Sequence, residues 1–366
     1  MRWMERWAAS TFVGVPTRFP ILPPSFRCWA SLALVCLWAS AAIVYPAMTK
    51  YPLYEPGLGG ERGDTGEYVH MYQGKPLREV LIPFRYRVFT PFMARLVPSA
   101  PKGLLRYFEM SADKRVAFCF GMVNLLGLAV AGLLMVGLCE ALGFNVGQGL
   151  LGALLFYTSF PVLNYAGAPM VEAWAWAFLL LGIVAVLRGT LGWLCVAGVV
   201  GMLAKETTLL LIAVVLLVSD TATGKLKKLA ALAPGLVIYG VFRFVFFAGG
   251  PGFSSNPISA YADLMSRFKQ GPYLWWIVFE GSTAFGLLCP LAALGAWTLR
   301  GAPRSPLMRL SWLVPGILLV PLVNALGMGS GIGRIWFYSF PAMIPLTLVG
   351  LERLVGGFGT KSPRAP

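Results

Sequence analysis

Long apolar runs separated by short polar stretches follow one another along almost the whole chain. A helix needs roughly 20 residues to cross a hydrocarbon core of about 30 Å, and runs of that order recur. One run, 191–219, is interrupted near its middle by Lys205 and Glu206. With its halves counted separately, the pattern predicts an all-α polytopic transmembrane helix bundle of about ten hydrophobic segments. The runs lie near 28–48, 115–139, 147–165, 169–187, 191–219, 229–248, 274–299, 310–328 and 335–354.

Composition supports a membrane location over an ordinary water-soluble domain. Hydrophobic residues make up 57% of the chain, charged residues only 12%, and the mean hydropathy is +0.71. Soluble domains carry about 25% charged residues. The 30 Lys and Arg against 15 Asp and Glu require no nucleic acid partner, because basic residues collect in cytoplasmic loops and are attracted by anionic membrane lipids. We expect a single transmembrane domain over 1–366.

The distribution of basic residues predicts the side of the membrane for each end of the chain. Four arginines before the first run favour a cytoplasmic N-terminal segment, 1–27, and the last basic residues place the tail, 355–366, on the same side. Ala-Ser-Ala-Ala at 40–43 could be a signal-peptide cleavage site. The segment before the apolar run is longer than a usual signal-peptide n-region, which favours an uncleaved first anchor.

The first loop, 49–114, is therefore expected outside the cytoplasm. It holds short amphipathic pieces, notably Val80–Val97, that could form interfacial helices. The lysines that follow Ser219 are cytoplasmic only if the chain folds back at Lys205 and Glu206. The interrupted run is thus predicted to be a hairpin of two short segments.

Under this topology, eight charged residues gather at one extracytoplasmic face. Charges in or beside a bilayer are costly unless they are paired or wetted, so their convergence is the functional signal. The eight candidates are Asp64, Glu67, Arg85, Arg87, Glu172, Lys205, Glu206 and Arg334.

The two carboxylates in the first loop have several possible roles. Asp64 and Glu67 are three residues apart, so a helix would present both on one face. They could share a divalent cation, Mg²⁺ or Mn²⁺, or divide the roles of base and support. Equally, they could be solvated loop residues or acids stabilised by a helix dipole. A zinc site of several histidines is excluded, because His70 is the only histidine.

The two arginines of the loop also allow two interpretations. Arg85 and Arg87 could bind a lipid phosphate through their planar guanidinium groups, or they could snorkel from an interfacial helix. Glu172, three residues after Pro169, falls in the first turn of a helix, where the dipole alone could account for it.

The remaining candidates lie at breaks in the apolar runs. Lys205 and Glu206 are adjacent, so they do not face each other on a helix, and at a hairpin tip they would line a wet cavity. Arg334 follows the glycine-rich stretch 329–333 and could bind phosphate or anchor the helix end.

The order of these motifs resembles the GT-C superfamily of polytopic glycosyltransferases, which take sugars from polyprenyl-phosphate-linked donors. The acidic motif departs from the Asp-x-Asp or Glu-x-Asp form of that superfamily. The motifs that carry the resemblance are Gly63-Asp64 with Glu67-Tyr68, then 164–169 with Glu172, then the glycine-rich 198–207 ending in Lys205-Glu206-Thr207, and finally Arg334 through Pro341.

The resemblance implies a membrane glycosyltransferase, inverting at the anomeric carbon, that serves the cell envelope with its site facing the periplasm or exterior of a bacterial inner membrane. Asp64 would be the general base, and Glu67 would support it or share the cation. Arg85, Arg87, Lys205 and Arg334 would stabilise charge on the departing lipid phosphate, beside Glu172 and Glu206.

A second hypothesis is a transporter or flippase for a lipid-linked or anionic solute. Buried charges and broken helices also mark transport paths. The acceptor and the sugar are not specified by either hypothesis.

Overall fold

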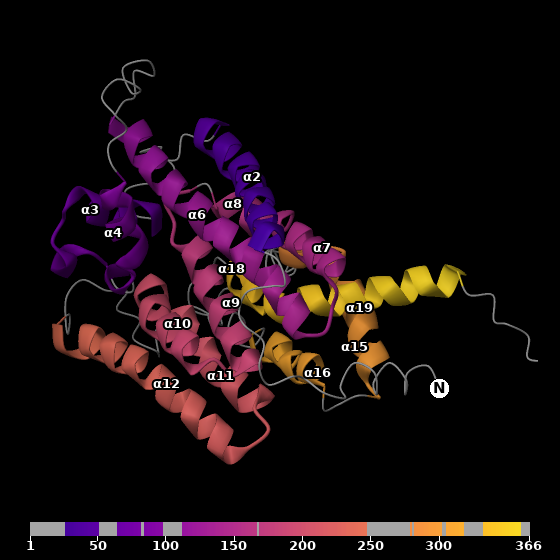
Figure 1. The fold of residues 1–366 in the computed structure, drawn as a ribbon. Helices are drawn as coiled ribbons and strands as arrows, with labels where there is room; N and C mark the ends of the chain where they lie inside the picture. The colour runs from indigo at the N-terminus through magenta and orange to yellow at the C-terminus, as the bar shows by residue number, and fades with distance from the viewer. Residues whose placement is uncertain are drawn as a thin grey trace, which may run out of the picture.

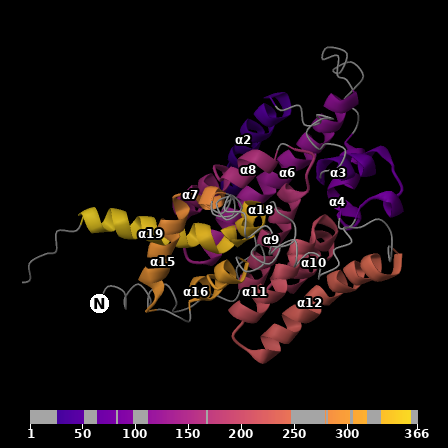
Figure 2. The ribbon, with the colours of Figure 1, turned by 180° about the vertical axis from the view of Figure 1, so that it is seen from behind.

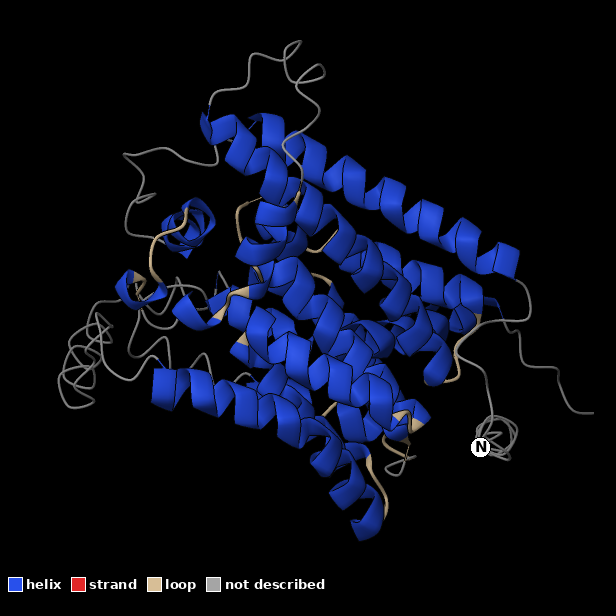
Figure 3. Cartoon of the chain, turned by 60° about the vertical axis from the view of Figure 1, so that its left-hand side comes forward, coloured by secondary structure: helices blue, strands red, loops and turns tan. Residues whose placement is uncertain are grey.

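A computed structural model of the chain describes residues 26–50, 64–81, 84–97, 112–166, 168–246, 279, 282–301, 305–317 and 332–359. Regular structure within these ranges is helical, without a strand, as Figure 3 shows. The all-α prediction is confirmed for this part of the chain. The predicted cytoplasmic segment 1–27 and tail 355–366 lie largely outside the described residues, as do parts of the runs near 274–299 and 310–328.

The helices carry the labels of Figure 1 in chain order. They are α2 (Phe26–Lys50), α3 (Asp64–Gln73), η1 (Leu77–Glu79), η2 (Phe84–Tyr86), α4 (Phe89–Leu96), α6 (Ala112–Ala141), α7 (Val146–Tyr157), α8 (Phe160–Tyr165), α9 (Glu172–Arg188), α10 (Leu191–Ala204), η3 (Glu206–Leu209), α11 (Leu210–Val218), α12 (Ala222–Val241), η4 (Phe242–Phe246), α15 (Leu288–Leu299), α16 (Pro306–Leu310), α18 (Ile332–Trp336), η5 (Phe337–Ser339) and α19 (Phe340–Gly359).

Four stretches of helix in the described ranges are long and apolar enough to cross a membrane by length and composition: Trp29–Pro46, Arg115–Ala141, Ala222–Phe246 and Arg334–Val355. Shorter apolar helices span Val146–Tyr157, Leu191–Ala204, Glu206–Val218 and Leu288–Leu299. These helices support a membrane protein. The predicted count of about ten spans is not confirmed.

Two predicted segments are broken where local chemistry stops a helix. The run near 147–165 is two helices, α7 and α8, because Ser159 takes the extended N-cap conformation and Pro161 lies in the first turn of the next helix. In the run near 274–299, Gly286 has a φ of +50°, a left-handed conformation that favours glycine, immediately before α15.

The chain reverses direction at Lys205 and Glu206, as the sequence predicted. Helix α10 packs against α9 and ends at Ala204, where Lys205 becomes extended. Helix α11 then returns along α9, since Leu211 contacts Gly182 ten residues into that helix. Figures 1 and 2 both place α12 alongside α10 and α11 at the edge of the molecule.

The described residues of the first loop, 64–81 and 84–97, fold into a small helical unit, here called the loop unit. It shares a hydrophobic core with α6, in which Tyr68 packs on Phe84 and Tyr72 packs on Phe120. Figures 1 and 2 show α3 and α4 beside α6, near one end of α12. Helix α4 leaves Phe92 and Leu96 exposed, as an interfacial helix would.

Two glycines bring α15 and α19 into close contact. Gly295 lies against the carbonyl group of Leu346, and Gly350 lies against that of Leu291. A Cβ atom at either glycine would overlap the facing carbonyl oxygen. Close approach through small residues is how helices associate where hydrophobic driving force is weak. The crossing fixes α19, and through it the position of α18, which carries Arg334.

Candidate functional site

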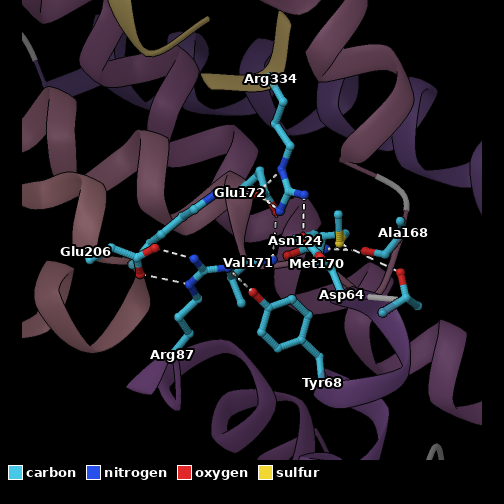
Figure 4. A network of polar contacts seen from close by, with 12 residues as sticks. Asp64, Tyr68, Arg87, Asn124, Ala168, Met170, Val171, Glu172, Glu206 and Arg334 are labelled. Carbon is cyan, nitrogen blue, oxygen red and sulfur yellow. Dashed lines mark hydrogen bonds and ion pairs between the residues drawn. The ribbon is translucent and has the colours of Figure 1, made fainter. Parts of the chain in front are cut away.

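Glu172, the first residue of α9, is the centre of a network of charged side chains (Figure 4). Its side chain is fully buried. The Lys205 Nζ atom donates to Glu172 Oε1 at 2.6 Å, and Arg334 Nε donates to the same oxygen at 2.6 Å. Arg334 Nη2 reaches it as well, and the Val171 backbone N–H donates to Oε2 at 3.1 Å. One carboxylate therefore holds two cations from distant helices.

Lys205 reaches this carboxylate because the backbone is extended at that residue, with φ −167° and ψ 142°. Its ammonium group lies 5.2 Å from the centre of the Tyr338 ring, a favourable cation–π position. Because the helix breaks at this point, the Glu206 side chain does not share the partner of Lys205 and pairs with Arg87. Adjacent residues thus serve different partners, as the sequence had indicated by their spacing.

Arg334 connects α18 to the loop unit. Its Nη1 atom makes an ion pair with the Asp64 carboxylate, while Nε and Nη2 engage Glu172. The guanidinium carbon lies 5.4 Å from the centre of the Tyr165 ring. Figure 4 shows Arg334 directed between these two carboxylates. The fork of donors lets one arginine bridge two acids.

Arg87 forms the second branch of the network. Its Nε atom donates to Glu206 Oε2 at 2.8 Å, Nη2 pairs with the other carboxylate oxygen, and Nη1 donates to the Tyr68 hydroxyl at 2.8 Å. Burial opposes the charge on Arg87, but the Glu206 carboxylate beside it raises the pKa of the guanidinium well above its ordinary value. Burial also raises the pKa of Tyr68, which stays neutral.

Accessibility varies strongly within the network. The Glu172 side chain is 0% exposed and that of Lys205 is 7% exposed, whereas Asp64 and Glu206 are 30% and 27% exposed. Three carboxylates, Asp64, Glu172 and Glu206, balance the three cations of Arg87, Lys205 and Arg334. The charges of the network therefore balance, and the two more accessible acids, Asp64 and Glu206, lie at its ends.

The structure thus brings six of the eight predicted residues into one network. The other two, Glu67 and Arg85, are buried within the loop unit. The predicted helix at Asp64 and Glu67 forms, but Glu67 accepts the Leu81 backbone N–H at 3.1 Å while Asp64 pairs with Arg334. Tyr68, four residues after Asp64, shares its face more closely than Glu67 does.

This separation bears on the predicted divalent cation. Asp64 and Glu67 have different partners, and within the described ranges no group of three or more His, Cys, Asp and Glu side chains is arranged to hold a metal ion. The shared cation stays a prediction.

Three tyrosines of the site were not singled out from the sequence as candidates. The Tyr68 hydroxyl accepts a hydrogen bond from Arg87 Nη1, and the rings of Tyr165 and Tyr338 lie beside Arg334 and Lys205. Tyrosines are common in apolar segments of membrane proteins, so nothing in their spacing separates them from core residues. The only available signal was the position of Tyr68 one turn after Asp64.

No protein-family model matches the chain, and no curated protein matches it either. Its function is therefore inferred from the chemistry of the charged network.

Proposed function

We propose that this protein is a membrane glycosyltransferase that moves a sugar from a polyprenyl-phosphate donor to an acceptor hydroxyl at the extracytoplasmic face. The observation that carries the proposal is the pairing of a partly exposed carboxylate, Asp64, with Arg334 in a network that holds two more cations. A base beside phosphate-binding cations is what displacement of a lipid phosphate by a hydroxyl requires.

Asp64 is the general base of the proposed reaction. Its carboxylate takes the proton of the acceptor hydroxyl while that oxygen bonds to the anomeric carbon of the sugar. The bond from the anomeric carbon to the phosphate oxygen breaks, and its electron pair leaves with the lipid phosphate. Direct displacement inverts the configuration at the anomeric carbon.

Arg334 and Lys205 stabilise the negative charge that develops on the departing phosphate. Both cations are held in place by the same oxygen of Glu172, so little reorganisation is needed when the charge appears. Glu172 is a positioning residue, since its buried carboxylate has no access to substrate. Arg87 and Glu206 fix the loop unit, and with it Asp64, against the helix hairpin.

Binding of the donor also prepares the base. In the absence of substrate, the Asp64 carboxylate forms an ion pair with Arg334. A phosphate that engages Arg334 competes with Asp64 for the same guanidinium, because phosphate and carboxylate both match its fork of donors. Asp64 is thereby released to accept a proton once the donor is in place.

The proposal is tested with purified protein, radiolabelled polyprenyl-phosphate sugars and a panel of acceptors. We expect Asp64→Asn to lower the rate of transfer by at least roughly 100-fold, the scale of general base catalysis. Asp220→Asn is the matched control, because Asp220 also forms an ion pair with an arginine, Arg309, away from the network. Its rate should stay within about twofold of the wild type, since an exposed pair contributes little.

Transfer by wild-type protein that continues unchanged in Asp64→Asn would exclude Asp64 as the base. If wild-type protein neither transfers sugar from any of the donors nor binds any of them, the glycosyltransferase proposal itself is contradicted. Size-exclusion profiles of both variants establish that each is folded.

The transporter hypothesis is favoured by one specific observation, the charged break between α10 and η3, because interrupted helices are common at solute sites. A transporter would move a lipid-linked or anionic solute across reconstituted vesicles without forming a covalent product. Measuring flux and product in the same vesicles separates the two functions.

A further inference from the structure

Arg243 has aromatic neighbours and, unlike the arginines of the charged network, no carboxylate partner among the described residues. It lies in η4, a π-helical turn at the end of α12, and is exposed. Its Nη1 atom donates to the Tyr239 hydroxyl at 2.7 Å. π-Helical turns are frequent at functional sites, because they change the direction of a side chain within a helix.

Three aromatic rings surround the guanidinium group. Its carbon atom lies 5.9 Å from the centre of the Tyr86 ring and 5.8 Å from the centres of the Tyr239 and Phe244 rings. Tyr86 and Tyr239 contact each other with ring centres 6.2 Å apart. Tyr86 belongs to the loop unit and precedes Arg87, so the group is built from two elements and adjoins the network.

Aromatic rings hold a guanidinium in position without neutralising its charge. Among the residues that the structure describes, Arg243 makes no ion pair with a carboxylate, unlike Arg87, Arg309 and Arg334. Its charge is therefore available to an anion. The planar fork of an arginine suits phosphate oxygens in particular.

The surroundings of Arg243 are apolar and exposed. Phe244, Val245 and Phe246 lie on the surface beside it, and Val237 is exposed further down α12. The stretch Ala222–Phe246 is one of the candidate membrane spans, and Arg243 lies near its end. A cation at the end of an apolar span, next to exposed apolar side chains, matches a ligand with a phosphate group and a hydrocarbon chain.

We propose that Arg243, with Tyr86 and Tyr239, binds the phosphate group of a membrane lipid whose hydrocarbon chain lies along the exposed face of α12. This inference goes beyond the proposed function, and it concerns binding, so it is tested without turnover. The phosphate belongs either to a polyprenyl phosphate or to a bulk phospholipid, and the two sources are separated by experiment.

The test uses native mass spectrometry of the purified full chain in detergent with three added lipids: a polyprenyl phosphate, the corresponding polyprenol and phosphatidylglycerol. We expect Arg243→Leu to weaken binding of the polyprenyl phosphate by about tenfold, as loss of a charge-assisted hydrogen bond does. Binding of polyprenol should not change. Tyr239→Phe removes a single hydroxyl that orients Arg243 and should weaken binding by a smaller factor, even if Arg243→Leu does not fold.

The matched control is Arg300→Leu, because the Arg300 guanidinium also lies over an aromatic ring, that of Trp297, at 3.9 Å. A loss in Arg243→Leu confined to polyprenyl phosphate supports the proposal and assigns the site to that lipid. An equal loss for phosphatidylglycerol supports it and assigns the site to bulk phospholipid. Unchanged binding of both lipids in Arg243→Leu and Tyr239→Phe, or an equal loss in Arg300→Leu, overturns it.

Discussion

At the scale of single residues, Glu172 has the most constrained environment in the network. The helix dipole alone could have accounted for an acid in the first turn of α9. The structure shows a larger role, because Lys205 and Arg334 both donate to one oxygen of this buried carboxylate. If Glu172 loses its charge, the buried Lys205 ammonium loses the carboxylate with which it pairs, and Arg334 keeps only its ion pair with Asp64.

We expect Glu172→Gln to destabilise the protein by about 3–5 kcal/mol, the range found when one partner of a buried ion pair is removed. Glutamine keeps the size of the side chain, so the effect isolates the charge. The control is Glu140→Gln, because Glu140 pairs with Arg188 at 3.6 Å where both side chains are partly exposed. That change should cost less than about 1 kcal/mol.

The measurement is thermal and denaturant unfolding of each variant in the same detergent. Equal stability of Glu172→Gln and wild type would mean that the two cations find other anions, and that Glu172 does not position them. A change in Glu140→Gln as large as that in Glu172→Gln would remove the distinction between buried and exposed pairs.

Much of the candidate site could be predicted because charge is rare in apolar runs. Glu172 and Lys205 stood out for that reason, Arg334 stood out at a break between runs and Asp64 in the first loop, and the network contains all four. The pairing could not be predicted, since it depends on which helices become neighbours. Glu67 was indistinguishable from Asp64 by spacing, yet its carboxylate accepts a hydrogen bond from the Leu81 backbone N–H within the loop unit.

At the scale of elements, the loop unit is attached to the helices through two ion pairs. Arg87, immediately after η2, meets Glu206 from η3, and Asp64 from α3 meets Arg334 from α18. Lys205 and Glu206 are adjacent but contact α9 and the loop unit respectively. The tip of the hairpin therefore joins the bundle to the loop.

A double-mutant cycle of Arg87→Ala and Glu206→Ala should give a coupling free energy of about 1–3 kcal/mol, as expected for contacting charges. The quantity is obtained from the rate of limited proteolysis within the loop unit, which reports its local opening. The same cycle on Arg309 and Asp220, an exposed pair outside the loop unit, should leave that rate unchanged. Additive effects of the first two substitutions would show that the loop unit is held by other contacts.

The helices themselves were largely predictable, because apolar runs of sufficient length form helices in a bilayer, where backbone polar groups must pair internally. The breaks were harder to predict. Ser159 and Gly286 interrupt runs that composition alone would continue, since caps and left-handed residues act over one or two positions. The hairpin was predictable only through the lysines that follow it.

At the scale of the whole molecule, the reversal at Lys205 decides which loops share a side. Lys227 at the start of α12 and Glu79 in the loop unit should lie on opposite faces of the membrane, because α12 runs from the end of α11 back toward Tyr86. Both side chains are exposed. Their accessibility to a reagent that cannot cross the membrane tests the arrangement directly.

In a background without native cysteines, we expect Glu79→Cys to react in intact cells and Lys227→Cys to react only after permeabilisation. The positive-inside rule gives this orientation, with the lysines of α12 in the cytoplasm. Reaction of both positions from the same side would contradict the hairpin, and reaction in the reverse order would place the charged network in the cytoplasm.

The ion pair between Asp64 and Arg334 joins residues 270 positions apart. Chains fold from the N-terminus as the ribosome delivers them, so Asp64 leaves the translocation machinery long before its partner has been translated. The network is completed only when α18 and α19 have entered the membrane. A nascent chain that ends before Arg334 would therefore carry every other charge of the network. It would still lack the arginine that bridges Asp64 of the loop unit and Glu172 of α9.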